Sequence, residues 1–312
     1  MEIEQRCPPG QIGTGKAFGT FGELLQGREA STQRDFLVTL PIERYARATF
    51  HPDPHALHVT VHPACKEKSR RLAQALLEYF SLPPGGVLTL QSELPAGKGL
   101  ASSSADLVAT ARAVCSCFRV ALPLPQLAAF MCQIEPSDGV MYPGIVAFYH
   151  REGRLRNFLG FLPPLTILGI DEGNEIDTLA FNTIPKPFTA ADEHEYQALL
   201  TRLTLAIQQR DLHTIGQITT RSAILNQKLN PKRTLYDVLR ISEEIGCPGV
   251  VVAHSGTCIG LLLARDGPDY HQQLALGRRH LALLTDDILT YHTLDFSQLR
   301  IKGVHRVARN DY

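Results

Sequence analysis

The sequence predicts an α+β fold made of two domains, and three observations support this. The chain has 312 residues, 44% of them hydrophobic, which is enough to bury the cores of two domains. Short strand-like runs alternate with segments of helical period in both halves. The break at Leu162-Pro163-Pro164 separates the halves, so we expect domains over residues 1–163 and 164–312.

The first half is predicted to be an α/β domain, because strands and helices alternate along it. The strands are short apolar, β-branched or alternating runs, over Phe36–Leu40, Ala46–His51, Leu57–His62 and Val87–Gln91. Apolar residues that repeat on one helical face predict three helices, over Ser69–Phe80, Leu107–Phe118 and Leu127–Gln133.

The second half is predicted to be an open α+β sandwich. Apolar runs predict strands over Leu165–Ile170, Gly249–Val252, Leu261–Ala264 and Ile288–Leu294. Helical periodicity covers Ala190–Gln209, Leu212–Leu229, Thr234–Ile245 and Tyr270–Leu284. Gly246 follows the third of these helices, in the position where glycine commonly ends a helix. The order of strand, helices, two strands, helix and strand fits this class.

The stretch Pro95–Asp106, PAGKGLASSSAD, is the most informative part of the chain. It joins a predicted strand to a predicted helix, and Gly97 and Gly99 let the backbone approach an anion closely. The start of a helix favours negative charge, so the loop is suited to bind phosphate. The hydroxyls of residues 102–104 can cap the first N–H groups and also face a metal-bound phosphate. An ATP-using enzyme is therefore predicted.

Two common phosphate-binding patterns do not describe this loop. The Walker pattern needs Lys directly before Ser or Thr, whereas Lys98 lies between Gly97 and Gly99. No G-x-G-x-x-G fingerprint of a dinucleotide-binding fold is present. On its own, the loop could also be only a well-capped helix start.

Two further segments extend the pattern over most of the chain. Residues 19–27 read GTFGELLQG, and residues 253–260 read AHSGTCIG between two apolar runs. Together with PxxxGLxSS in the loop, they resemble the three motifs of the GHMP kinases, the superfamily of galactokinase, homoserine kinase and mevalonate kinase. The third motif has fewer glycines than the commoner form. GELLQG, GKGLASSSAD, EPSDGVMYPG and AHSGT together are most similar to the L-threonine kinase branch.

The resemblance implies the two-domain GHMP kinase fold, with a ferredoxin-like C-terminal half, and the use of ATP and Mg²⁺. Lys98 could contact a phosphate as a point charge and so assist catalysis, or it could be a solvated loop lysine. The loop residues expected to bind ATP are Pro95, Gly97, Lys98, Gly99, Leu100, Ala101, Ser102, Ser103 and Ser104.

The same resemblance implies a magnesium pair. Ser103 falls on the second serine of the family motif, which is a magnesium ligand in family members. Glu135 lies 32 residues later, close to the separation of the second ligand in homoserine kinase-like members. A hydroxyl, a carboxylate and phosphate oxygens are ordinary ligands of Mg²⁺.

Asp138 is implied as the catalytic aspartate. The turn formers Pro136, Ser137 and Gly139 predict an exposed, bent segment that directs this carboxylate into a cleft. Only two residues separate Asp138 from Glu135, so the sequence leaves open which of them binds the metal and which accepts the proton.

The acceptor site is implied by the first and third motifs. An amino-acid acceptor carries an ammonium and a carboxylate, so the site should offer an acid and a basic or N–H group. The residues expected there are Thr20, Gly22, Glu23, Asp138, Ser255, Gly256 and Thr257, while His254 is expected to hold the turn of the third motif. Weaker polar candidates are Asp177, Thr178, Asn182, Arg221, Ser222, Asn226 and Gln227.

Composition excludes several other classes of partner. The 31 basic and 31 acidic residues balance without long blocks of one sign, which is unlike a nucleic-acid or membrane-surface protein. No apolar run approaches the roughly 20 residues of a membrane span. The seven scattered cysteines and the lone C-x-C at Cys115 and Cys117 indicate reduced thiols and no zinc site. We therefore expect a cytoplasmic protein with a small-molecule substrate, acting as a monomer or a homodimer.

The leading functional hypothesis is an ATP-dependent kinase that phosphorylates the side-chain hydroxyl of L-threonine or a close amino-alcohol analogue. A second hypothesis keeps the fold and changes the acceptor to homoserine or another small metabolite. A third is a non-catalytic ligand-binding homologue. The set of Ser103, Glu135 and Asp138 favours an enzyme over the third hypothesis.

Overall fold

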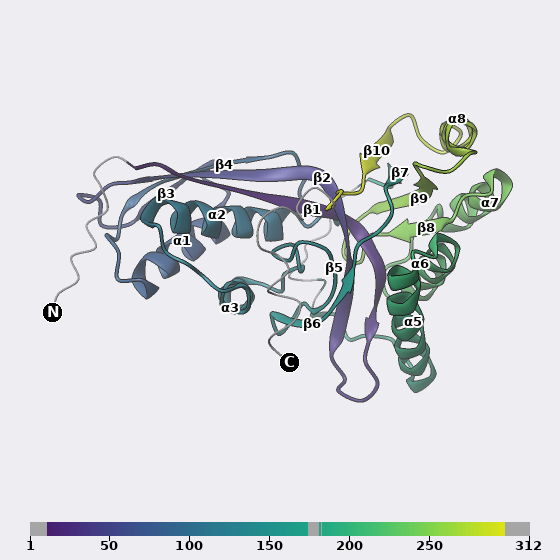
Figure 1. The fold of residues 1–312 in the computed structure, drawn as a ribbon, viewed down its shortest axis with the longest axis horizontal. Helices are drawn as coiled ribbons and strands as arrows, with labels where there is room; N and C mark the ends of the chain where they lie inside the picture. The colour runs from purple at the N-terminus through teal and green to yellow at the C-terminus, as the bar shows by residue number, and fades with distance from the viewer. Residues whose placement is uncertain (1–10, 174–180, 182, 297–312) are drawn as a thin grey trace.

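Two long antiparallel strands, β1 (Gly13–Arg28) and β2 (Asp35–Pro52), run through most of the molecule in the computed structural model, which describes residues 11–173, 181 and 183–296 (Figure 1). Their pairing extends from Gly13 opposite Phe50 to the hairpin end. The register shifts within residues 18–25 of β1. Such irregularities bend a strand and redirect its side chains, and here they coincide with the first motif.

In the described residues, the other strands add to this pair to form a single ten-stranded sheet with the order β10-β7-β9-β8-β1-β2-β4-β3, while β5 pairs with β2 and β6 pairs with β5. Glu23 of β1 pairs with Val252 of β8, so this residue lies where strands from the two halves of the chain meet. The added strands are β3 (Val59–His62), β4 (Gly86–Ser92), β5 (Ile145–Tyr149), β6 (Arg154–Gly160), β7 (Leu165–Asp171), β8 (Gly249–Val252), β9 (Cys258–Ala264) and β10 (Ile288–His292).

Three helices of the first half lie together on one side of β1 to β4 (Figure 1). They are α1 (Glu67–Tyr79), α2 (Ser102–Phe118) and α3 (Leu124–Ile134). Helix α2 packs directly on β1 and β2 and buries Leu107, Val108 and Val114 in the larger hydrophobic core. This packing fixes the helix whose first turn carries the serine run.

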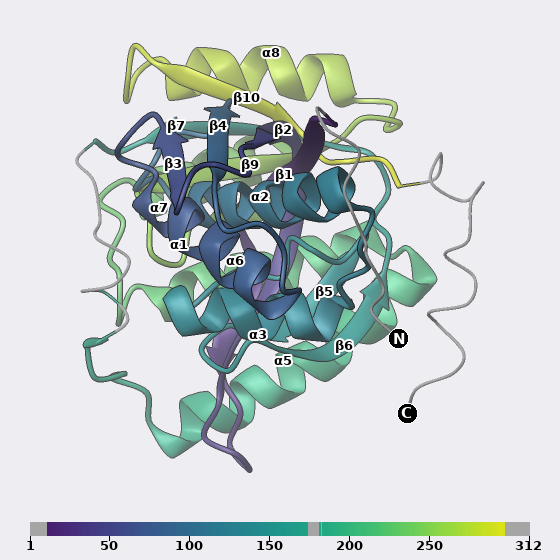
Figure 2. The ribbon, with the colours of Figure 1, turned by 90° about the vertical axis from the view of Figure 1, so that its left-hand side faces the viewer.

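The described helices of the second half pack on β1 and on β6 to β9. They are α5 (Ala190–Gln209), α6 (Leu212–Asn226), α7 (Leu235–Ile245) and α8 (Tyr270–Leu281), and Figure 2 shows α8 and α5 at opposite ends of the molecule. Helices α7 and α8 enclose a second, smaller core with Leu168, Val250 and Leu261 of the sheet. Helix α6 instead packs on β8 and β1, close to the first motif.

The predicted α+β class is confirmed, and most predicted elements are present with small changes in their ends. Gly246 ends α7 in the left-handed conformation, with φ of 65°, as predicted. The separate strands predicted over 36–40 and 46–51 are wrong, because β2 continues through Pro41, which lies opposite Thr20 beside the irregular part of β1. Strand β1 was not predicted because its glycines hide the alternation of side chains. The domain division at residue 163 stays a prediction.

Candidate active site

The three motif segments meet at one place in the structure. The Thr20 N–H of the first motif donates to the Leu100 carbonyl at 3.2 Å. The Thr257 N–H of the third motif donates to the Lys98 carbonyl at 3.3 Å. The loop before α2 is therefore hydrogen-bonded on both sides by segments that are far away in sequence.

Glycines make this close approach feasible. Gly99 has φ of 81°, and a Cβ there would lie 2.3 Å from the Cβ of Ala253. A Cβ on Gly256 would lie 2.1 Å from the Lys98 carbonyl oxygen. Neither separation is sterically allowed, so the loop and the third motif can touch only because these two residues lack side chains.

Helix α2 begins without a side-chain cap. Its N-cap residue is Ala101, in the left-handed conformation, and the prediction that the serine hydroxyls cap the helix is wrong. Ser102 donates instead to the Leu94 carbonyl at 2.9 Å. Because the N-cap residue is Ala101, one position before the serines, the serine side chains extend from the first turn toward other partners. A helix start of this kind suits an anion, which can accept from the backbone N–H groups.

Ser103 and Glu135, the predicted magnesium pair, are in direct contact. The Ser103 hydroxyl donates to Oε1 of Glu135, and the Glu135 side chain is 2% exposed. The other carboxylate oxygen, Oε2, accepts from Nζ of Lys68 at 2.5 Å. Lys68 precedes the apolar face of α1 and was not predicted, because a lysine in a helix resembles an ordinary solvated residue.

Asp138 lies beside the next serine of the same turn. The Ser104 hydroxyl donates to Oδ2 of Asp138 at 3.0 Å and also lies 3.0 Å from the Asp138 backbone N–H, which it can accept. Burial raises the pKa of the Asp138 carboxyl to about 6, the hydrogen bond from Ser104 opposes this, and the charge of Glu135 adds to it. The pKa of Asp138 therefore lies closer to neutral pH than that of an ordinary aspartate.

The prediction that the turn around Asp138 is exposed is wrong. Glu135 and Ser137 are 4% and 3% exposed, and a Cβ on Gly139 would lie 2.7 Å from Val146 of β5. The Ser137 N–H donates to the His150 carbonyl at 3.1 Å. Turn-forming residues predict the backbone conformation of a segment, but they do not predict which other elements pack against it.

Glu23 is a second buried acid. It is 6% exposed, and its Oε2 accepts from the His254 backbone N–H at 2.7 Å. Burial raises the pKa of Glu23 well above its ordinary value, and the negative charge of Asp138 raises it further. Two carboxylates that repel each other in a buried place provide a strong preference for a positively charged ligand group.

Comparison with known proteins agrees with this geometry. Residues 67–148 match the GHMP kinases N terminal domain. The chain is 29% identical over 256 residues to an L-threonine kinase of Citrobacter freundii, covering 80% of this chain and 85% of the relative. An L-threonine kinase of Salmonella typhimurium is 28% identical over the same length, covering 80% of this chain and 82% of the relative. The chain thus carries a segment that matches the GHMP kinases N terminal domain, and most of its length is similar to L-threonine kinases.

Solved structures confirm the fold. Mevalonate kinase of L. major superposes with a TM-score of 0.66 at 16% identity, covering 94% of this chain and 98% of that one. Homoserine kinase of Cytophaga hutchinsonii superposes with a TM-score of 0.67 at 14% identity, covering 94% and 96%. These structures show that the chain has the α+β fold of the GHMP kinases, as predicted. The similarity to the L-threonine kinases indicates that it is a phosphotransferase.

Several buried polar groups of this kinase lack hydrogen-bond partners within the described residues. Both ring nitrogens of His254 lack one, although the ring packs between His150 and Phe181, with ring centroids 5.7 and 5.2 Å away. Burial holds the pKa of His254 well below its ordinary value, so the ring is neutral. An unpaired buried group costs about 1–3 kcal/mol, so such a set marks a site that a ligand completes. The others near the first and third motifs are Thr20, Gln26, Lys186 and Asn226.

Contacts between elements place these groups around Glu23. The Gln26 N–H donates to the Ser222 hydroxyl of α6 at 3.2 Å, and Asn226 lies one turn further along the same helix. The Asn230 amide donates to the His254 carbonyl at 2.9 Å. Lys232 is only 3% exposed, and burial lowers its pKa to about 8. Lys232 and Gln26 were not predicted. Gln26 lies within the first motif but was not selected there, and nothing in the sequence surroundings of Lys232 distinguishes it.

Lys98 lies at the site with a partner that was not predicted. Its Nζ is 2.7 Å from Oδ2 of Asp171, at the end of β7, and the Thr257 hydroxyl donates to Oδ1 of the same carboxylate. A similar pair joins Nζ of Lys66 to Asp106 at 2.6 Å. The kinase therefore keeps three lysines, at positions 66, 68 and 98, on carboxylates that surround the phosphate loop.

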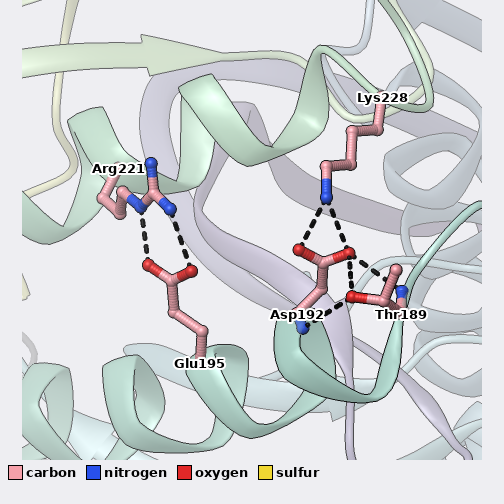
Figure 3. Close-up of polar contacts among 5 residues, drawn as sticks. All are labelled: Thr189, Asp192, Glu195, Arg221 and Lys228. Atoms are coloured by element: carbon pink, nitrogen blue, oxygen red, sulfur yellow. Dashed lines mark hydrogen bonds and ion pairs between the residues drawn. The ribbon is translucent and has the colours of Figure 1, made fainter.

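The weaker acceptor candidates are scattered. Arg221 is 45% exposed and forms two hydrogen bonds, of 2.6 and 2.9 Å, with Glu195 of α5 (Figure 3). The Gln227 side-chain oxygen accepts a hydrogen bond from the Lys232 backbone N–H at 2.6 Å. Ser222 and Asn226 lie on the face of α6 near β1, as described above. Asp177, Thr178 and Asn182 lie outside the described residues.

Further features limit the chemistry of the site. In residues 11–173, 181 and 183–296, no group of three His, Cys, Asp or Glu side chains could hold a metal ion. Among the described cysteines, Cys65, Cys115, Cys132, Cys247 and Cys258 are free thiols. None of the described helices has the length and apolar character needed to cross a bilayer.

Proposed function

We propose that this kinase transfers the γ-phosphoryl group of ATP, with Mg²⁺, to the side-chain hydroxyl of L-threonine. The observation that carries the proposal is the pair of adjacent serines at the start of α2. Ser103 contacts the buried Glu135, and Ser104 contacts the half-buried Asp138, so the first turn of α2 brings a hydroxyl–carboxylate pair suited to a metal next to a second carboxylate. The L-threonine kinases of Citrobacter and Salmonella support the choice of acceptor.

The phosphates of ATP would lie against residues 97–104. The uncapped start of α2 offers backbone N–H groups, and the helix dipole favours the negative charge of the triphosphate. Lys98 belongs to this loop, and its ammonium, 2.7 Å from the carboxylate of Asp171, would contribute a positive charge. Such positioning and charge compensation supply most of the catalysis in phosphoryl transfer.

Ser103 and Glu135 are the residues that would hold Mg²⁺. They offer one hydroxyl and one carboxylate oxygen, and Mg²⁺ usually takes its remaining ligands from phosphate and water. A bound Mg²⁺ would offset charge on the phosphate oxygens. Since Ser103 contacts Glu135 and Ser104 contacts Asp138, we assign the metal to Glu135 and the proton to Asp138.

Asp138 would orient the acceptor hydroxyl and accept its proton. A base works best when its pKa lies near the pH of the reaction, and the pKa of about 6 meets this requirement. Ser104 fixes the carboxylate with one hydrogen bond at 3.0 Å and leaves the other oxygen, Oδ1, for the substrate.

Glu23 and the unpartnered groups around it would bind the two charged ends of the amino acid. The ammonium of L-threonine would relieve the repulsion between Glu23 and Asp138. Its carboxylate would accept from donors among Gln26, Asn226 and His254, whose polar side-chain atoms lack other partners in the described structure. The backbone of Thr20, Gly22 and residues 255–257 would complete the site between the motifs.

The test is an ADP-release assay with a panel of acceptors, with the position of the new phosphate checked by NMR. Each unpaired buried group costs about 1–3 kcal/mol, so acceptors that lack an ammonium or carboxylate should be rejected. We expect the highest kcat/KM for L-threonine, lower values for L-serine and L-homoserine, and no turnover of 2-butanol. If homoserine exceeds threonine by more than about tenfold, the proposed acceptor is wrong while the kinase assignment stands.

A further inference from the structure

Lys68 occupies the carboxylate that we assign to magnesium. Its Nζ lies 2.5 Å from Oε2 of Glu135, while Ser103 donates to Oε1. The two partners differ in exposure: the Glu135 side chain is 2% exposed, and the Lys68 side chain is 39% exposed. The ammonium therefore reaches a buried carboxylate from the solvent side.

This ion pair has a clear electrostatic reason. A buried carboxylate is unfavourable unless a positive charge compensates it, and Lys68 supplies that charge. A divalent cation held by Ser103 and Glu135 would supply the same compensation more strongly. Two cations a few ångströms apart repel each other, so the ammonium and the metal would compete for Glu135.

A displaced Lys68 has an alternative partner close by. The loop that begins α2 lies next to Ser103 and is the proposed binding site of the triphosphate, whose terminal phosphates would be the nearest large negative charge. Lysine has a flexible four-carbon side chain and donates in several directions, so its ammonium can move between these positions. Lys66, held by Asp106 at 2.6 Å, keeps the start of α1 beside α2.

We propose that Lys68 is an exchangeable counter-ion: it compensates Glu135 before the metal binds, and it then pairs with the terminal phosphates of the nucleotide. The proposal rests on the phosphate and metal sites of the proposed function, and it is independent of the acceptor.

The decisive experiment uses Lys68→Met and measures two affinities that should change in opposite directions. Mn²⁺, followed by its electron paramagnetic resonance signal in the absence of nucleotide, should bind about three- to tenfold more tightly, because no ammonium has to be displaced. MgATP, measured by calorimetry, should bind about tenfold more weakly, because a phosphate contact is lost. AMP lacks the terminal phosphates and should bind unchanged. Lys68→Arg keeps the charge and should restore most of the affinity for MgATP.

Lys228→Met is a matched control. The Lys228 side chain is 46% exposed and its Nζ lies 2.7 Å from Asp192, whose side chain is 9% exposed (Figure 3). This pair therefore resembles that of Lys68 and Glu135, because an exposed ammonium again contacts a shielded carboxylate. Lys228 follows the end of α6, and its ion pair with Asp192 connects this end to α5. This variant should change neither the affinity for Mn²⁺ nor that for MgATP.

Three results would overturn the proposal. Unchanged or weaker Mn²⁺ binding in Lys68→Met would show that the ammonium does not compete with the metal. Equal weakening of MgATP and AMP, with a lower melting temperature, would show a purely structural ion pair. No Mn²⁺ binding to the wild type without nucleotide would also reject the exchange. Ser103→Ala tests the metal site apart from the role of Lys68. If this variant binds Mn²⁺ as the wild type does, the assignment of the metal to Ser103 and Glu135 is wrong.

Discussion

Asp192 in α5 and Asp138 in the active site are both shielded by protein, but their surroundings move the pKa in opposite directions. Asp192 accepts from Nζ of Lys228 at 2.7 and 2.8 Å and from the N–H and hydroxyl of Thr189 at 2.8 and 2.9 Å (Figure 3). The hydrogen bond from Lys228 is the main cause that lowers the pKa of Asp192 to about 2. Asp138 has one hydroxyl, that of Ser104, on its carboxylate, and burial raises its pKa to about 6.

Under the proposed function, this difference separates a structural acid from a reactive one. Asp192 completes a capping box with Thr189 and, through Lys228, connects the end of α6 to α5, so its negative charge is compensated within the fold. The Asp138 carboxylate has fewer donors, and burial raises its pKa to about 6, which costs stability and favours acceptance of a proton. Burial and the number of donors together distinguish the two roles.

The largest expected effect follows from replacing the reactive acid. Asp138→Asn removes the proton acceptor while keeping the shape and the hydrogen bond to Ser104, so kcat should fall by roughly 10² to 10⁴. Affinity for MgATP should stay nearly unchanged, because Ser103 and Glu135 are intact. The measurement is single-turnover phosphoryl transfer together with calorimetric titration of MgATP. A variant that loses nucleotide or metal binding would reassign Asp138 to the metal and Glu135 to the proton.

The same variant should be more stable than the wild type at neutral pH. The folded protein raises the pKa of Asp138, so holding the carboxylate charged costs free energy that grows as the pH rises from the unfolded pKa to about 6 and is complete above it. Asn removes this cost, and we expect a gain of about 1–3 kcal/mol at pH 7. The gain should shrink as the pH falls toward 4, which urea unfolding at several pH values would show. Equal gains at pH 4.5 and 7 would contradict this electrostatic account.

The next effect in size tests the neighbouring serine. Ser103→Ala should lower kcat by a factor of ten or more and should weaken the dependence on Mg²⁺, because a metal ligand is lost. Ser102→Ala is a suitable control, since Ser102 donates to the Leu94 carbonyl and contacts neither acid. Unchanged turnover and unchanged Mg²⁺ dependence in Ser103→Ala would remove this residue from the metal site.

The contact between Ser103 and Glu135 could be anticipated, because the resemblance to the GHMP kinases implies that these two residues share a metal ion. Their role as metal ligands stays a prediction. The lysines at positions 66, 68 and 232 could not be anticipated, since a lysine becomes informative only when a buried carboxylate is opposite it. The burial of the Asp138 turn was missed for a related reason: its cover comes from β5, which the local pattern does not reveal.

The fold shows the same division. Helices α5 and α7 were predicted nearly to the residue, because helical periodicity is a local property of the sequence. Strand β1 was missed because its glycines serve the packing of α2 and the third motif and not the alternation of a sheet. Non-local contacts therefore account for most of what the sequence did not reveal.

The smallest expected effect concerns Asp192, the structural acid of the comparison. Asp192→Asn loses the ion pair with Lys228 and weakens the capping box, so it should cost about 1 kcal/mol of stability and leave kcat and KM unchanged. The folded protein lowers the pKa of Asp192, so its contribution is complete above the ordinary value near 3.8 and is lost only as the pH falls toward 2. The loss of stability should therefore be the same at pH 5 and pH 7, whereas the gain in Asp138→Asn should grow over that interval. Urea midpoints of the two variants at both pH values measure this contrast directly. If Asp192→Asn lowers kcat, or if both variants change stability with the same sign, the division between structural and reactive acids fails.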